Sequence, residues 1–245
     1  MTHSDRRDTV TLAYIDEPPF GWTQADGIAT GADVELADTI LRAIGVETIV
    51  HHATTFAELL PGVENERWDI NVPLFVTAER ATRVNFSVPV WAIGDGFLVR
   101  TGNPKQLTDY VSLAHRADAR LGIITGQVQH LAATRAGVSA AQITLFDEQS
   151  DAIDALRSGA IDAYASTALG NRIVAERVGT DVVSAVAHEA GHSVPRGAFS
   201  FSKRNRALLE AFDRQLRIYL GSADHRERMG RYGFTAAEID PVASR

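Results

Sequence analysis

The sequence contains no cysteine among its 245 residues, and only 7% of them are aromatic. The absence of cysteine excludes a disulfide framework, Cys-ligated zinc, iron–sulfur clusters and thiol chemistry. A long apolar run is also missing, because residues 1–8 are polar and Thr9–Ile15 is too short for a signal-peptide core or a membrane span. We therefore expect either a cytosolic protein or the mature form of an exported one.

Basic residues are too few for broad binding to nucleic acid. The chain has 24 Lys and Arg against 31 Asp and Glu, a formal charge of −7, whereas nucleic-acid binding needs a basic footprint. We accordingly expect no nucleic-acid partner. A chain of this length buries roughly 70% of the surface that its unfolded form exposes, which suits one large domain or two small lobes.

Alternating strands and helices are what the sequence does contain. In the first part of the chain, strands are predicted at Thr9–Ile15, Glu47–His51 and Asp69–Phe75, and helices at Asp33–Ile44, at Phe56–Asn65 with an interruption at Pro61-Gly62, and from Thr77. A second series follows, with strands at Gly122–Thr125, Ile143–Phe146 and Ile161–Ala165 and helices at Gln127–Ala136 and Ser150–Ser158. This β-α-β-α-β order predicts mostly parallel sheets with helices on their faces.

Two short apolar stretches, Phe97–Thr101 and Ala198–Ser202, are expected to carry the chain from a first lobe to a second and back. A last helix at Asn205–Leu220 would then belong to the first lobe. The predicted fold is α/β with two lobes, residues 9–99 plus 198–245 and residues 100–197, hinged by the two crossing segments with a cleft between them.

Candidate ligand-binding residues lie at or just after the ends of the predicted strands. In open parallel sheets, ligands bind outside the carboxyl ends of the strands. There the first lobe carries a carboxylate, three phenylalanine rings and an arginine, namely Glu17, Phe20, Phe56, Phe75 and Arg80. We call these five the strand-end set. Rings attract a cation that donates few hydrogen bonds, and the carboxylate balances its charge, so the set could hold a small zwitterion. The alternative is that the rings are ordinary core residues.

Arg80 has an unusual predicted position. It falls in the first turn of the helix that begins at Thr77, where the helix dipole disfavours a cation by a few tenths to about 1 kcal/mol. An arginine fits there if an anion occupies the helix N-terminus and the guanidinium grips it through two parallel hydrogen bonds. The alternative is a solvated arginine paired with Glu79 or Glu66.

A literal H-E-x-x-H pattern is present at His188–His192. In zinc proteases both histidines face one side of a helix and the glutamate acts as a base. Val182, Val183 and Val186 could belong to such a helix, but Ser193-Val194-Pro195 would break it within one turn, and no third ligand is evident. We interpret the pattern as a chance match on a surface segment and expect no metal.

The segment Thr77–Ser87 (TAERATRVNFS) resembles the signature TPERAxxVxFS of the family 3 solute-binding proteins of ABC importers. Further matches follow in family order at Gly31–Ala37 (GADVELA), Leu121–Gly126 (LGIITG) and Ser158–Ala163 (SGAIDA). The resemblance implies the two-lobed periplasmic-binding-protein fold of type II and a monomer at the periplasmic or extracellular side of the membrane. Such a protein delivers a small solute to the permease of the importer, without enzymatic activity or cofactor. The resemblance also implies that Arg80 binds the carboxylate of the ligand.

Three positions depart from the amino-acid binders of this family. The aspartate that pairs with the ammonium group of the ligand is replaced by Thr167, a small residue five positions before the arginine is Phe75, and a threonine at a helix start in the second lobe is Gln127. Losing a buried partner for the ammonium group costs about 2–5 kcal/mol. A primary α-amino acid is therefore a poor expected ligand.

Within the family, the chain most resembles the ectoine- and hydroxyectoine-binding proteins, through Trp91–Phe97, Gly102–Lys105, Asp162–Ala165, Thr167–Leu169 and Gly197–Phe199. Those proteins hold a cyclic amidinium between aromatic rings, with a glutamate on the cation and an arginine on the carboxylate. The positions that match are the strand-end set, and Gln127 and Thr167 complete the expected ligand-binding residues. The expected ligand is a small zwitterionic compatible solute similar to ectoine or hydroxyectoine, or an amino-acid derivative. Because Gln127 differs from the pattern, it is expected to be a relative of ectoine rather than ectoine itself.

Two other functions stay open. Cyclohexadienyl and arogenate dehydratases resemble these binders, and such a lyase would need a general acid, for which Glu17 is the only strong candidate. A cytosolic ligand sensor is the other alternative, suggested by the absence of a recognisable signal peptide.

A zinc measurement tests the interpretation of the H-E-x-x-H segment. We expect protein purified without chelators or metal-affinity tags to hold far less than stoichiometric zinc by elemental analysis, because a lasting site needs more protein ligands than two histidines. Stoichiometric zinc that is lost in His188→Ala would contradict this interpretation.

Overall fold

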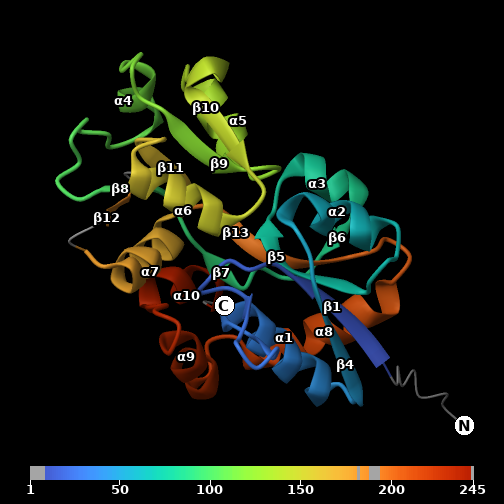
Figure 1. Cartoon of the computed structure of the whole chain (residues 1–245). Helices are drawn as coiled ribbons and strands as arrows, with labels where there is room; N and C mark the ends of the chain where they lie inside the picture. The colour runs from blue at the N-terminus through green and yellow to red at the C-terminus, as the bar shows by residue number, and fades with distance from the viewer. Residues whose placement is uncertain (1–8, 181–182, 188–193, 244–245) are drawn as a thin grey trace, which may run out of the picture. The chain divides into compact units, whose positions relative to one another are not determined.

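The computed structural model describes residues 9–180, 183–187 and 194–243. The chain divides into two units, Met1–Ala92 with Arg196–Arg245 (unit 1) and Ile93–Pro195 (unit 2), both seen in Figure 1. Unit 1 is therefore discontinuous in sequence. None of the helices among the described residues is both long and apolar enough to cross a membrane.

Unit 1 is built on a sheet of strand order β4-β1-β5-β13-β6, with β7 paired to β13. Its strands are β1 (Thr9–Tyr14), β4 (Thr48–Ala53), β5 (Ile70–Phe75), β6 (Asn85–Phe86), β7 (Trp91–Ala92) and β13 (Arg196–Phe201). β4, β1 and β5 are parallel, whereas β13 runs antiparallel to β5, β6 and β7. A two-stranded hairpin of β2 (Trp22–Thr23) and β3 (Ala29–Thr30) precedes the first helix.

Helices cover both faces of this sheet. They are α1 (Ala32–Ala43), α2 (Phe56–Glu64), α3 (Ala78–Arg83), α8 (Arg206–Tyr219), α9 (Ala223–Gly230) and α10 (Ala236–Ala243). The connection from β1 through α1 to β4 runs one way across the sheet, and the connection from β4 through α2 to β5 runs back. Because such crossovers are right-handed, α1 and α2 lie on opposite faces. α1 packs with α8, and α2 packs with α3 and against β5 and β13.

The central strand β5 is buried at all of its residues, as expected for a strand covered by helices on both faces. It contains Pro73, which cannot donate a hydrogen bond to a neighbouring strand. The register with β13 shifts at this place, so that Val72 and Pro73 lie opposite Phe199 alone. The bulge lets a proline occupy the middle of the sheet.

Unit 2 repeats the same arrangement with the strand order β10-β9-β11-β8-β12. Its strands are β8 (Asp95–Arg100), β9 (Leu121–Ile124), β10 (Ile143–Phe146), β11 (Ala163–Thr167) and β12 (Val183–Ala187). Its helices are α4 (Tyr110–Ala114), α5 (Gln129–Arg135), α6 (Gln149–Ser158) and α7 (Ala168–Val178), with a 3₁₀ turn at Ala140–Gln142. β10, β9 and β11 are parallel, and β8 is antiparallel to β11 and β12. The α/β fold class predicted from the sequence is thus confirmed.

An ion-pair cluster joins three segments of unit 2. The carboxylate of Asp162, which is nearly inaccessible, lies 2.9 Å from Lys105 Nζ and 3.2 Å from Arg100 Nη2, and it accepts the N–H of Arg120 at 2.9 Å. Burial alone would raise the pKa of Asp162, but these donors outweigh it and hold that pKa below its usual value. Lys105 and Asp162 belong to two of the segments in which the sequence resembles ectoine binders, and here they pair with each other.

Several elements differ from the prediction. Pro61 lies inside α2 and does not interrupt it. Pro61 is the sixth residue of the helix, so its missing N–H removes one internal hydrogen bond, and the helix continues past it to Glu64. α5 begins at Gln129, two residues after the predicted start at Gln127. α8 is not the last helix, because α9 and α10 follow it; α9 is so polar that only His225 and Met229 are buried along it.

The H-E-x-x-H segment, His188–His192, lies outside the described residues. Val183 and Val186, which could have begun a metal-binding helix, belong instead to β12, a strand paired with β8. Among the residues that the structure describes, no three His, Asp or Glu side chains gather in a way that could hold a metal ion.

The buried imidazole of His225 makes stability depend on pH. His225 is fully buried, its Nδ1 accepts the N–H of Gly221 at 3.2 Å, and burial with the charge of Arg226 lowers its pKa to about 4. The unfolded chain therefore binds a proton that the folded chain does not between about pH 6.5 and pH 4. We expect the free energy of unfolding to fall as the pH drops through this window, by on the order of 3 kcal/mol from this group.

Urea unfolding at a series of pH values measures this effect. His225→Asn keeps an acceptor for Gly221 but cannot be protonated, so its stability should fall less than that of the wild type below pH 6.5. The exposed His130 of unit 2 provides the matched control, His130→Gln, which should follow the wild-type profile. Parallel pH profiles of His225→Asn and the wild type would contradict the assignment.

Candidate functional site

The strand-end set gathers at one edge of the unit 1 sheet. β1, β4 and β5 are parallel, so the segments that follow them leave from the same edge, and Thr54 donates its N–H to the carbonyl of Tyr14 at 2.9 Å. The loop with Glu17 and Phe20 follows β1, Phe56 begins α2 after β4, and Arg80 lies in α3 after β5. This edge is where ligands bind in open parallel sheets.

The loop with Glu17 and Phe20 is held by its own backbone and by the start of α1. The N–H of Glu17 donates to Gly21 O at 2.8 Å and that of Phe20 to Glu17 O at 3.0 Å, while the N–H of Asp33 donates to Phe20 O at 2.9 Å. Gly31, with φ of 122°, lets α1 approach this closely, because a Cβ there would lie 2.5 Å from Phe20 O. Glu17 is thereby fixed in a buried place, 9% exposed.

Arg80 is buried against the end of β5. Thr77 caps α3 by accepting the N–H of Arg80 at 3.1 Å, and the guanidinium turns back so that Nη1 donates to Phe75 O at 3.0 Å. Its Cζ also lies 5.5 Å from the centre of the Phe56 ring. Burial lowers the pKa of Arg80 to about 10, with a partial offset from Glu79, so the side chain remains a cation at neutral pH.

The structure contradicts the solvated position and the Glu66 partner that the alternative interpretation gave to Arg80. The side chain is only 8% exposed. Glu66, one of its two expected partners, instead accepts hydrogen bonds from Ser202 at 3.1 Å and Arg204 at 3.4 Å. The guanidinium of Arg80 is thus buried at the edge of the sheet, near the N-terminal end of α3. A helix N-terminus attracts anions.

Trp91 contacts two of the phenylalanine rings of the strand-end set. We call Phe20, Phe75 and Trp91 the aromatic cluster. The Trp91 ring lies 5.8 Å from Phe20 and 5.3 Å from Phe75, the second pair perpendicular. Phe20 also contacts Phe234 edge-on at 6.0 Å. Phe20 and Phe75 are 8% and 9% exposed, so they do pack as core residues, as one interpretation expected, while Phe56 is only half-buried.

A second carboxyl group lies beneath this cluster. Asp33 is 1% exposed and its Oδ1 accepts the indole N–H of Trp91 at 3.1 Å. Burial, and to a smaller extent the charge of Glu17, raise the pKa of Asp33 well above its usual value, although the hydrogen bond from Trp91 opposes them. Neither Asp33 nor Trp91 was among the predicted site residues, although both lie within the segments that carry the family resemblance.

The two remaining candidates, Gln127 and Thr167, belong to unit 2. Each is 7% exposed. Thr167 caps α7, because its Oγ1 accepts the N–H of Gly170 at 3.0 Å, and Gln127 lies in the turn before α5, its N–H donating to Ile124 O at 3.1 Å. Thr167 therefore has a structural role of its own, and the contacts of both residues with a ligand stay predictions.

Sequence reasoning also missed a polar cluster at the start of β8. Asp95 accepts the phenol of Tyr110 at 3.0 Å and the amide of Gln129 at 2.9 Å. Burial raises the pKa of Asp95, and burial together with the charge of Asp95 raises that of Tyr110. The cluster joins α4 and α5 to the first residue of β8.

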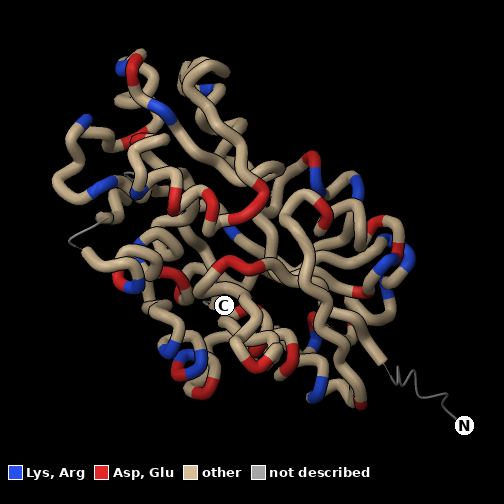
Figure 2. Tube along the Cα trace, viewed as in Figure 1, with Lys and Arg blue, Asp and Glu red and all other residues tan. Residues whose placement is uncertain are grey.

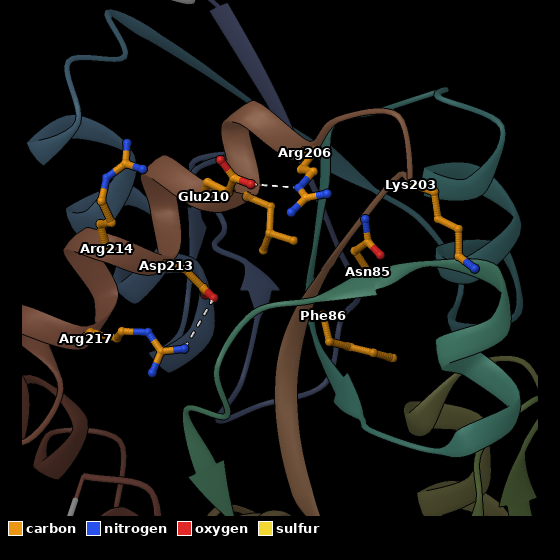
Figure 3. A pocket seen from close by; sticks show the side chains of 9 residues that line it. Asn85, Phe86, Lys203, Arg206, Glu210, Asp213, Arg214 and Arg217 are labelled. Atoms are coloured by element: carbon orange, nitrogen blue, oxygen red, sulfur yellow. Dashed lines mark hydrogen bonds and ion pairs between the residues drawn. The ribbon is translucent and has the colours of Figure 1, made fainter. Parts of the chain in front are cut away.

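A surface hollow of about 670 Å³ lies beside α8, and Figure 3 shows its lining. Two of its cations pair with acids on the same helix, Arg206 with Glu210 at 2.7 Å and Arg217 with Asp213 at 3.9 Å. Phe86 is its one aromatic side chain, and the strand-end set has no member in it. Along both units Lys and Arg are interspersed with Asp and Glu, as Figure 2 shows. We therefore place the candidate site at the strand-end set.

Two units, each a doubly wound sheet with antiparallel strands added at one side, define a periplasmic-binding protein of type II. The chain belongs to family 3 of the bacterial extracellular solute-binding proteins, whose sequence model matches residues 10–232.

Comparison with individual proteins agrees with this family. The chain is similar to a protein of Sinorhizobium fredii (strain NBRC 101917 / NGR234) named "Probable amino-acid ABC transporter periplasmic-binding protein y4tE". The two are 27% identical over 243 residues, which cover 96% of this chain and 80% of that protein. The crystal structure of EhuB in complex with hydroxyectoine is similar with a TM-score of 0.87 and 26% identity, covering 97% of this chain and 95% of that one. An ancestral arginine-binding protein bound to glutamine shares the fold, with a TM-score of 0.83, 22% identity, and coverage of 92% and 98%.

Gly197 provides the space for the aromatic cluster. In the sheet it pairs with Phe75 on one side and Trp91 on the other, and a Cβ there would lie 2.1 Å from the Trp91 ring. Gly197→Ala should therefore displace Trp91 and destabilise the chain by about 1–3 kcal/mol. Gly230→Ala is the matched control, because a Cβ there meets nothing within 4 Å.

Urea unfolding and near-ultraviolet circular dichroism measure the two variants. We expect Gly230→Ala to keep the wild-type aromatic spectrum, and Gly197→Ala to change it. Equal stability and identical spectra of the two variants would contradict the packing described above.

Proposed function

We propose that the chain captures a small zwitterion that combines a carboxylate with a delocalised cation, such as ectoine or hydroxyectoine, for an ABC importer. The observation that carries this proposal is the series of contacts within unit 1 from Phe56 through Arg80 and Phe75 to Trp91 and Phe20. Glu17 lies on the same loop as Phe20. A cation, rings and a carboxylate thus follow one another along one sheet edge.

Arg80 would hold the carboxylate of the ligand. A guanidinium presents a planar fork that matches the two oxygens of a carboxylate, and such bonds are among the stronger ones in proteins. The nearby helix N-terminus of α3 adds a further attraction for negative charge. Burial, which lowers the pKa of Arg80 to about 10, also means that water screens its charge little.

The rings and Glu17 would hold the cation. A delocalised cation such as an amidinium has few N–H donors, so the negative faces of aromatic rings contribute much of its binding. Glu17 balances the positive charge and accepts its hydrogen bonds. A primary ammonium group needs more acceptors, and Thr167, at the position where amino-acid binders carry an aspartate, supplies no charge.

Two similarities support this ligand class. EhuB, whose structure contains hydroxyectoine, covers nearly the whole chain in the structural comparison, and the strand-end set matches the residues expected from the ectoine binders. The relative from Sinorhizobium fredii, named for amino-acid transport, supports the wider class of small zwitterions. We propose that the chain delivers its ligand unchanged to the importer permease, as a monomer on the extracellular side of the membrane.

Isothermal titration calorimetry tests the proposal with ectoine, hydroxyectoine, proline betaine and the standard amino acids. We expect binding of a zwitterion with a delocalised or quaternary cation. Arg80→Lys should weaken it by about 30-fold or more, because a lysine keeps the charge but loses the paired hydrogen bonds. Arg83→Lys, one turn further along α3 and paired with Glu64 at the surface, is the matched control and should bind as the wild type does.

Other outcomes would favour the other functions. The absence of heat and of a thermal shift with every zwitterion in the panel would defeat the proposal. Conversion of prephenate or arogenate that is lost in Glu17→Gln would instead favour a lyase. Recovery of the native gene product in the cytosolic fraction of its cells would favour a sensor over an importer component.

A further inference from the structure

Trp91 contacts two of the three rings that carry the proposed cation site. It lies in β7, pairs with β13, contacts Phe20 on the loop after β1 and Phe75 at the end of β5, and donates its indole N–H to Asp33 of α1. It is itself 3% exposed. It therefore lies behind the rings that would meet the ligand.

The hydrogen bond to Asp33 sets the rotation of the indole. Packing alone leaves a flat ring free to turn over, whereas an N–H donor that must reach one acceptor selects one orientation. Oδ1 of Asp33 is 3.1 Å from Nε1, and Asp33 is fixed by its own N–H, which donates to Phe20 O at 2.9 Å. The backbone N–H of Asp33 thus binds the carbonyl of Phe20, while its carboxyl orients Trp91, the neighbour of both rings.

The sheet register explains how one indole reaches both rings. Gly197 of β13 lies between Phe75 and Trp91, which are its partners on the two sides. With no Cβ on the middle strand, the Trp91 ring extends across it and meets Phe75 perpendicularly. A shift of the indole would therefore move the ring of Phe75. The backbone carbonyl of the same residue accepts a hydrogen bond from Arg80.

We propose that Asp33 and Trp91 are positioning residues of the ligand site, in which the Oδ1–Nε1 hydrogen bond holds the indole so that Phe20 and Phe75 keep the spacing that a flat cation requires. This inference rests on the proposed function for its ligand. It concerns residues that contact the site residues and do not themselves need to touch the ligand.

Trp68 provides a control of matched chemistry in the same unit. It is 5% exposed, its indole N–H donates to Asn71, and its ring neighbours are Arg67 and His52. Trp68→Phe removes the same atoms as Trp91→Phe from an equally buried place. A loss of packing alone would affect both variants, whereas a positioning role belongs to Trp91 only.

Calorimetry on the full chain measures the affinity for the zwitterion that binds the wild type. We expect Trp91→Phe and Asp33→Ala to weaken it on the order of tenfold, as misplaced aromatic contacts and an unmade buried hydrogen bond would. Asp33→Asn keeps an acceptor for Nε1 and resembles the uncharged carboxyl that the raised pKa of Asp33 favours, so it should stay within about threefold of the wild type. Trp68→Phe should do the same.

A measurement without ligand separates this inference from the proposed function. In protein labelled with 4-fluorophenylalanine, ¹⁹F resonances of Phe20 and Phe75 are assigned by substitution of each residue. We expect Trp91→Phe and Asp33→Ala to shift or broaden both resonances, and Asp33→Asn and Trp68→Phe to leave them in place. If the wild type binds nothing in the panel while these shifts occur, the proposed function fails and the positioning of the rings stands.

Two results would overturn the inference. One is that both resonances stay unchanged in Trp91→Phe and Asp33→Ala. The other is that Trp68→Phe weakens binding as much as Trp91→Phe does, because that would make the effect one of general stability.

Discussion

The packing of Trp91 over Gly197 is the contact on which unit 1 depends. It joins β7, the last element before the chain leaves unit 1, to β13, the first element after the chain returns. The same indole contacts the end of β5 and the loop after β1 and is hydrogen-bonded to α1. A discontinuous unit needs contacts that join its two sequence segments. Here β13 also pairs with β5 and α1 packs with α8, but the contact of Trp91 with Gly197 is the one that lies behind the candidate site. Close packing makes such a place sensitive to a single methyl group.

Charge is arranged around this contact in two layers. Arg80 and Glu17 lie at the sheet edge, each less than a tenth exposed, and Asp33 lies deeper. Burial and the charge of Glu17 favour the uncharged form of Asp33 by raising its pKa, so the deeper carboxyl accepts a hydrogen bond without adding a second full negative charge beside Glu17. The strand-end set itself then contributes one cation, Arg80, and one anion, Glu17, as the proposed binding of a zwitterion requires.

Much of the fold could be predicted from the sequence, because helical spacing of apolar residues marks α1 and a short apolar run marks the strand β5. The polar helix α9 was missed because its buried side chains are too few to form a visible stripe. Pro61 was predicted to interrupt its helix, but α2 contains it. Pro73 lies in the middle of the sheet, where a bulge opposite Phe199 accommodates a residue without an N–H donor.

The candidate site could be predicted only in part, for a different reason. Parallel strands bring Glu17, Phe20, Phe56 and Arg80 to one edge, so a simple topological rule finds them. Trp91 and Asp33 come from β7 and α1, and their contact depends on a register across Gly197 that periodicity does not reveal.

The segments in which the chain resembles the ectoine binders contain residues with structural contacts. The resemblance at these residues therefore concerns the scaffold. Lys105 pairs with Asp162, Thr167 caps α7, and Gly197 makes room for Trp91. Similarity at such positions indicates a similar scaffold, since each residue is needed for packing or charge balance whatever the ligand is. In the proposed function, the chemistry of the ligand depends instead on Arg80 and Glu17 and on the rings of the strand-end set. Structural similarity at the scaffold positions therefore bears on the fold, whereas the proposed ligand class rests on the strand-end set.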